Sequence, residues 1–141
     1  MKSILETYAE MIAARQLRFQ SVKLPLLAAL KSIGVSITEV EYDGSGDDGQ
    51  IDSIRAYNED GQEISLNSHP FSFGEGDAAV SYDSLEDFID NFAWDVLGTY
   101  HDGFVNNDGG YGTLTINVAE GTITLTHNDR CIEVNVTETE I

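Results

Sequence analysis

The feature that most constrains the fold is a strict alternation of apolar and polar residues near the end of the chain. In the first of the alternating segments, apolar Leu114, Ile116 and Val118 are separated by threonine and asparagine. Successive side chains of a strand point to opposite faces of a sheet, so this pattern predicts a strand with one buried face. The same period recurs nearby. The three segments are residues 113–118, 122–126 and 132–136.

Turn residues lie between these segments. Residues 119–121 and Asn128-Asp129 are both rich in the residue types that favour turns, so we expect a three-stranded antiparallel meander. Earlier in the chain, β-branched residues predict three further strands. These are residues 35–42, 51–57 and 62–66.

The connection over residues 67–80 contains Pro70 and two glycines and is expected to be a long loop. Two aromatic residues in it, Phe71 and Phe73, are expected to attach the loop to the core.

Two helices are expected at the N-terminus. Ser3 and Glu6 have the spacing of a capping box, which predicts a helix over residues 3–19. Pro25 removes a hydrogen bond from a helix interior, so we place it in the first turn of a second helix over residues 24–32. Gly34 is expected to end that helix.

A central helix is predicted over residues 83–97. Asp83 and Glu86 have the spacing of a capping box at its start. Apolar residues then recur at helical spacing and form one stripe, which is expected to face the core. The stripe is Leu85, Phe88, Ile89, Phe92 and Val96.

Together these elements predict an α+β fold in one domain, residues 1–141. N-terminal helices and one central helix would pack on one face of an antiparallel β-sheet that ends in the meander. Residues 1–33 form the helical segment and residues 34–141 the α+β body. The two groups of three strands are compatible with one continuous sheet.

Charge restricts the partners that the protein can have. The net charge is −18, and it is unevenly distributed. Residues 1–31 hold five basic and two acidic side chains, and the rest of the chain holds two basic and 23 acidic ones. A field of this size repels nucleic acid and attracts basic surfaces, so we exclude direct nucleic-acid binding and expect a basic protein as partner. The basic N-terminal segment would pack on the acidic body or mediate a homodimer.

The expected cellular compartment follows from weaker signals in the sequence. Cys131 is a lone cysteine, which excludes an internal disulfide and fits a reducing cytoplasm. Polar residues interrupt the N-terminal segment, which predicts that it is no signal peptide. Apolar stretches are too short to span a bilayer, so no membrane association is expected.

Two runs rich in glycine and aspartate stand out. The first reads Tyr-Asp-Gly-Ser-Gly-Asp-Asp-Gly-Gln-Ile over residues 42–51, and the second reads Asn-Asn-Asp-Gly-Gly-Tyr-Gly over residues 106–112. Such runs lose much conformational entropy on folding, so they are either turns or a site. The pair resembles the motifs YDGSGDxGQI and NNDGxYG of a family of small acidic bacterial and mobile-element proteins, a domain of unknown function. The resemblance implies no activity.

The two runs would meet if they form a site. A metal-binding or hydrolytic site would draw on Tyr42, Asp43, Asp47, Gln50, Asn107, Asp108 and Tyr111. The first run has oxygen ligands at the first, third and fifth positions of a calcium loop but lacks the required glycine and the bidentate glutamate. It also lacks the lysine of a phosphate-binding loop. A divalent cation is therefore an alternative, and no cofactor is our main expectation.

Catalytic side chains have no clear pattern. His127 and Cys131 could approach each other across a turn, but His127 continues the apolar alternation of its strand, which favours a half-buried structural role. His101-Asp102 could form an acid–base pair, although a histidine near a helix C-terminus is common for electrostatic reasons. No metal-ligand spacing links His69, His101 and His127. We therefore favour a protein that is not an enzyme.

The central helix offers the other candidate site. Opposite its apolar stripe lies an acidic face with Trp94 in its midst. Its members are Asp83, Glu86, Asp87, Asp90 and Trp94. A tryptophan among charges is typical of an interface anchor, although the N-terminal helix could instead cover it. Our first hypothesis is a non-catalytic acidic inhibitor that docks on a basic protein surface. It would act as a nucleic-acid mimic (a DNA mimic) against a nucleic-acid-binding complex, in phage or plasmid counter-defence of the anti-CRISPR kind.

Overall fold

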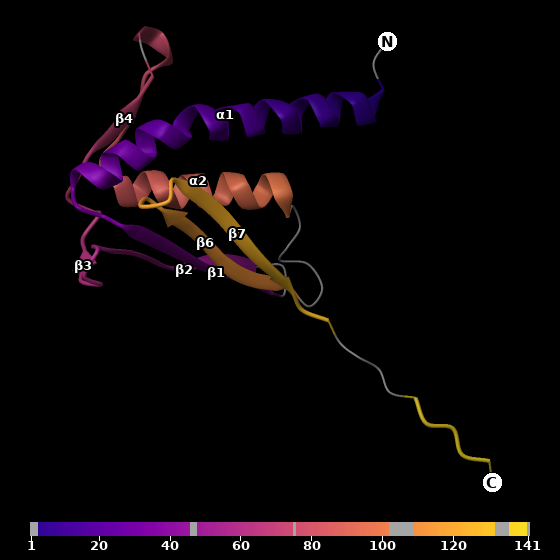
Figure 1. Cartoon of the computed structure of the whole chain (residues 1–141). Coiled ribbons are helices and arrows are strands. Elements are labelled where there is room, and N and C mark those ends of the chain that lie inside the picture. The colour runs from indigo at the N-terminus through magenta and orange to yellow at the C-terminus, as the bar shows by residue number, and fades with distance from the viewer. Residues whose placement is uncertain (1–2, 46–47, 75, 102–108, 132–135, 141) are drawn as a thin grey trace.

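The computed structural model describes residues 3–45, 48–74, 76–101, 109–131 and 136–140. Two helices lie over one face of a five-stranded antiparallel sheet with strand order β3-β2-β1-β6-β7 (Figure 1). A small second sheet pairs β4 with β5. The predicted α+β class, with helices on one face of an antiparallel sheet, is confirmed.

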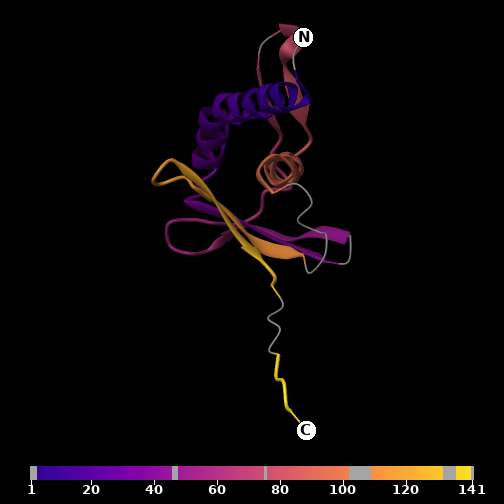
Figure 2. The same ribbon diagram turned by 90° about the vertical axis from the view of Figure 1, so that its right-hand side faces the viewer.

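Helix α1 is a single helix, Ile4–Ser32, where the sequence predicted two. Ser3 caps it as expected, because its hydroxyl accepts from the Glu6 amide at 3.1 Å. Pro25 lies inside the helix and removes one backbone hydrogen bond. The helix continues because Val22 and Leu26 are buried on either side of the proline, and their packing outweighs the lost bond. The axis of α1 is bent in Figure 2.

The end of α1 follows the expectation. Ile33 is the C-cap, and Gly34 follows with a left-handed φ of 86°. Residues with a side chain rarely adopt this conformation, so glycine suits the position. The chain then turns directly into the sheet.

Helix α2 is Leu85–Tyr100 and begins later than predicted. Its cap is Ser84 and not Asp83, because the Ser84 hydroxyl accepts from the Asp87 amide at 3.1 Å. Asp83 is therefore outside the helix. The apolar stripe is buried as predicted, and Ile89 lies at its centre with no exposed surface.

Strand β1 (Ile37–Ser45) lies in the middle of the sheet, between β2 (Asp48–Tyr57) and β6 (Gly110–Asn117). Both glycine-rich runs were expected as loops, but each lies partly within a strand. Gly44 pairs with Gly49 on one side and with Gly110 on the other. The ladder satisfies the backbone groups of these glycines on both sides of β1.

The far strands are β3 (Glu63–Ile64) and β7 (Thr122–Asp129). The turn over residues 119–121 is confirmed, with Gly121 at a φ of 71°. The expected turn at Asn128-Asp129 is wrong, because both residues pair with β6. The third meander strand was predicted over residues 132–136. Residues 132–135 lie outside the described residues, and Val136 is not in a strand.

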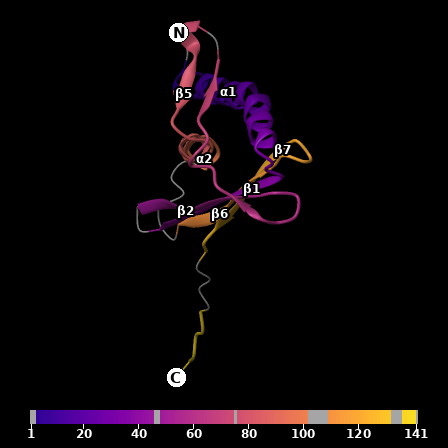
Figure 3. The same cartoon turned by 90° about the vertical axis from the view of Figure 1, so that its left-hand side faces the viewer.

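The predicted loop over residues 67–80 contains a hairpin. Its strands are β4 (Phe71–Phe73) and β5 (Val80–Tyr82), joined by a 3-10 turn, Gly76–Ala78. Figure 3 shows this hairpin rising beside the two helices. The predicted attachment is confirmed, because the Phe71 ring lies 4.7 Å from that of Phe88.

The core lies between the sheet and the helices. Its fully buried side chains come from α1, α2, β1 and β6. They are Leu26, Leu30, Thr38, Val40, Leu85, Ile89, Leu97, Leu114 and Ile116. Among the described residues, neither helix has the length and the apolar character needed to cross a bilayer.

Candidate functional site

The acidic face of α2 is open to solvent. Trp94 has 38% of its surface exposed, so α1 does not bury it. Helix α1 packs on another side of α2, where the Phe19 ring lies 5.5 Å from that of Phe92. Asp83 and Asp87 are exposed as well, and their neighbours Glu86 and Asp90 are half-buried.

A neighbouring strand adds to this face. Glu86, Asp87 and Asp90 line a depression together with Asp52 of β2, beside Ile51 and Ile54. Four carboxylates therefore surround one shallow hollow of about 310 Å³, and none of the described residues that line it is basic. We call Asp52, Glu86, Asp87, Asp90 and Trp94 the acidic surface.

The two glycine-rich runs lie side by side, as a shared site would require. Tyr42 pairs with Gly112 and Asp43 with Tyr111 across β1 and β6. Gly109 begins this close approach with a φ of 79°, and a Cβ there would lie 1.8 Å from the Gly44 carbonyl oxygen. Only glycine fits at that position.

Arg130 joins the two runs. Its guanidinium donates to both carboxylate oxygens of Asp43, at 3.0 and 2.8 Å, and to the Gly44 carbonyl at 3.0 Å. It also lies over the Tyr111 ring at 4.9 Å. The hydrogen bonds from Arg130 lower the pKa of Asp43 and raise that of Arg130. Asp43 is thereby engaged with an internal cation, which weakens its use as a metal ligand.

Gln50 lies at the same point, because it pairs with Asp43 across β1 and β2 and lines one hollow with it. The Gln50 amide donates to Asp52 at 2.6 Å. Asp47, Asn107 and Asp108 lie outside the described residues. Within the described ranges, no three His, Cys, Asp or Glu side chains are placed to share a metal ion.

A hydrogen-bonded chain crosses the sheet above Gly112. Tyr42, Gly112 and His127 are direct neighbours on β1, β6 and β7. The Tyr42 hydroxyl lies 2.6 Å from His127 Nδ1, and His127 Nε2 lies 2.9 Å from an oxygen of Asp129. In the tautomer with the proton on Nε2, the imidazole donates to Asp129 and its Nδ1 accepts from the tyrosine hydroxyl.

Two glycines leave the space that these hydrogen-bonded side chains occupy. A Cβ on Gly112 would lie 2.7 Å from the Tyr42 hydroxyl, and one on Gly110 would lie 2.7 Å from Cε1 of His127. The histidine side chain is almost buried, at 4% exposed. Burial also raises the pKa of Tyr42 to about 12, with a further contribution from the charge of Asp129. Tyr42 therefore stays protonated and able to donate at neutral pH.

His101 stacks against the histidine of this hydrogen-bonded series. It is the C-cap of α2, and its ring lies 3.9 Å from that of His127, with the two planes 20° apart. Burial lowers the pKa of His101, and the proximity of His127 lowers it further. The lowered pKa favours the neutral form of His101 near pH 7, and one ring nitrogen of a neutral imidazole can accept a hydrogen bond.

This meeting of the two histidines is not predictable from the sequence. The alternation of β7 correctly placed His127 on the inner face with Ile123 and Leu125, but its partners come from distant elements. The proposed pairing of His101 with Asp102 stays a prediction, and the structure shows no contact between the described residues His127 and Cys131. Asp102 lies outside the described residues, and Cys131 is exposed beyond the end of β7. The sequence did hold one signal of a closely packed side chain here, which is the pair of glycines on β6 opposite His127.

The elements described above define a small acidic α+β domain with a polar cluster on the inner face of its sheet. The chain belongs to a family of unknown function, DUF6878, whose model matches residues 19–141. This confirms the expected membership of an uncharacterised family. The bacterial and mobile-element origin implied by the motifs stays a prediction. Comparisons with curated proteins and with solved structures give no match.

Proposed function

We propose that the protein is a non-catalytic acidic inhibitor that docks on a basic protein surface. The single observation that supports this most is the acidic surface, where four carboxylates from two elements line one hollow and the exposed Trp94 follows Asp90 by about one turn of α2. An aromatic anchor surrounded by charge is the arrangement that gives an interface both affinity and fast association.

The spacing of the carboxylates supports mimicry of a nucleic acid. Glu86, Asp87 and Asp90 lie within four residues of each other on α2, which is about 6 Å along the helix axis. Asp90 is three residues from Asp87 and four from Glu86, so these carboxylates are neighbours on the helix surface and form a row of negative charge, as the phosphates of a DNA strand do. A basic groove that accepts a phosphate backbone would therefore accept this row. In the counter-defence setting, that groove would belong to a nucleic-acid-binding complex.

The test is capture of partners from a bacterial lysate, followed by a displacement assay. We compare the wild type with Trp94→Ala and with Asp87→Asn/Asp90→Asn. The matched control, Glu59→Gln/Asp60→Asn, removes the same charge from the exposed turn before β3. We expect one captured protein that is lost at high salt and lost with either variant on α2, but kept with the control.

The displacement assay then decides the mechanism. The captured protein is bound to labelled DNA, and the acidic chain is added. Release of the DNA by the wild type, and not by the α2 variants, is the expected result. If the control variant loses the captured protein to the same extent, the attraction depends on the total negative charge and not on the acidic surface. That result would contradict the proposal.

A second candidate is a metal-binding or hydrolytic site at the two glycine-rich runs. The observation in its favour is their pairing on β1 and β6, with Tyr42 and His127 held beside them. Thermal unfolding with added Ca²⁺, Mg²⁺ or Zn²⁺ tests the metal form. A rise in melting temperature that Asp43→Asn abolishes would support it, and no rise with any of the three would count against it.

A further inference from the structure

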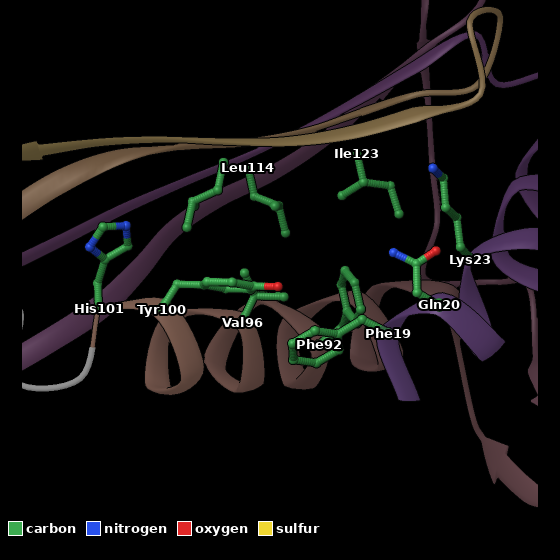
Figure 4. A pocket seen from close by; sticks show the side chains of 10 residues that line it. Phe19, Gln20, Lys23, Phe92, Val96, Tyr100, His101, Leu114 and Ile123 are labelled. Atoms are coloured by element: carbon green, nitrogen blue, oxygen red, sulfur yellow. The ribbon is translucent and has the colours of Figure 1, made fainter. Parts of the chain in front are cut away.

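A cavity of about 320 Å³ lies between the helices and the inner face of β6 and β7 (Figure 4). Six of the ten described lining side chains are apolar, and they come from four elements. The apolar lining is Phe19, Phe92, Val96, Leu114, Ile123 and Leu125. The volume of the cavity is at the lower end of the range for small-molecule sites, about 300–1,000 Å³.

The polar side chains of the cavity lie at its two ends and between them. Gln20 and Lys23 of α1 lie at one end, and His101 lies at the other, with the Tyr100 hydroxyl between them (Figure 4). Among the described lining side chains, Lys23 is the only cation, since the lowered pKa of His101 favours the neutral imidazole. The cavity thus has a local positive charge in a protein with a net charge of −18.

The two ends differ in their preference for charge. His101 caps the C-terminus of α2, where the helix dipole is negative and disfavours an anion. Asp129 lies close to the same end through its contact with His127. An anionic group is therefore favoured only at the end with Lys23 and Gln20, where an ammonium and an amide can both donate to it.

We propose that this cavity binds a small amphipathic monocarboxylate, with its carboxylate at Lys23 and Gln20 and its hydrocarbon body along the apolar wall. The lining fits other ligand classes poorly. One histidine without Cys, Asp or Glu does not make a metal site, and one lysine does not hold a polyphosphate. This binding is independent of the acidic surface, which lies on another side of α2.

The experiment is a calorimetric titration of the full chain with octanoate. Hexanoate tests the contribution of the hydrocarbon, and octanol tests the need for the charge. Burial of each methylene tightens binding about fourfold, so we expect hexanoate to bind roughly 15-fold more weakly than octanoate. We expect octanol to bind at least tenfold more weakly as well, and the amide shifts in an NMR titration to centre on the cavity.

Two variants locate the site. Lys23→Met keeps the length of the side chain and is expected to weaken octanoate binding about tenfold. The control Lys31→Met makes the same change further along α1, outside the cavity, and is expected to leave binding unchanged. Circular dichroism of each variant establishes that it is folded.

The contrary results are specific. Equal binding of octanol and octanoate, unchanged by Lys23→Met, would mean an apolar cavity without preference for an anion and would overturn the proposal. Equal losses with Lys23→Met and Lys31→Met would mean nonspecific attraction to the basic helix. No binding of octanoate at millimolar concentration would overturn it outright.

Discussion

Replacement of Gly112 by alanine tests the role given to the hydrogen-bonded chain across the sheet. The new Cβ would lie 2.0 Å from the Thr126 carbonyl oxygen and 2.7 Å from the Tyr42 hydroxyl. Neither contact can persist, so β7 must move away from β6 or the hydrogen bond between Tyr42 and His127 must break. The residue is in the middle of a strand, where neighbours on both sides hold the backbone.

The expected cost has two parts. Overpacking of a well-packed site costs about 1–3 kcal/mol. Loss of a hydrogen bond between buried groups costs about 1–3 kcal/mol more, because the tyrosine and the histidine are left without each other. We therefore expect Gly112→Ala to lower the free energy of unfolding by about 2–6 kcal/mol, a large part of the total for a domain of this size.

Urea denaturation followed by circular dichroism measures this loss, with Gly98→Ala as the matched control. Gly98 lies in α2, and a Cβ there would meet nothing within 4 Å. The same chemical change should therefore stabilise the protein by about 1 kcal/mol through helix propensity. Tyr42→Phe added to Gly112→Ala should restore little stability, because the shorter contact is to a backbone oxygen. Equal effects at Gly98 and Gly112 would refute the reasoning.

Three further results are expected. Arg130→Met should raise the pKa of the Asp43 carboxyl toward its ordinary value in an NMR titration, and should reduce the stability that is present above that value and lost as pH falls. The raised pKa of Tyr42 should contribute stability below pH 10 that is lost between pH 10 and about 12, and urea denaturation at alkaline pH should show less of this loss in Tyr42→Phe. The lowered pKa of His101 should make the protein less stable as pH falls below 6.5. His101→Phe keeps the stacked ring and should flatten that decline. An unchanged dependence of stability on pH in this variant would contradict the burial assigned to His101.

The parts of the fold that depend on local periodicity were predictable. The alternation around Leu114 placed β6 and its buried face, and the stripe around Ile89 placed α2. Both patterns report which face of an element is buried, and burial is what selects them. The errors came from rules that act on single residues. Pro25 was expected to divide a helix that its buried neighbours keep whole, and Asn128 was expected to turn where the ladder with β6 holds it in a strand.

The two candidate sites differ in the same respect, because one follows from a local sequence pattern and the other does not. Trp94 and the acidic residues of α2 follow from helical spacing, so that face could be read from the sequence. The cluster of Tyr42, His101 and His127 could not, because its members are separated by long stretches of chain. Only the order of strands and the path of α2 over the sheet bring them together, and neither is encoded by local pattern.

The central position of β1 has a consequence for how the chain reaches its structure. Its pairing with β2 closes a short hairpin, and β6 with β7 closes another, and such hairpins form in about 1–10 μs. The pairing of β1 with β6 instead joins residue 37 to residue 117, across the whole of α2. Closing so long a loop costs entropy before any contact repays it, so this step should limit the folding rate. During synthesis the first hairpin must therefore wait, with one edge open, until β6 has left the ribosome.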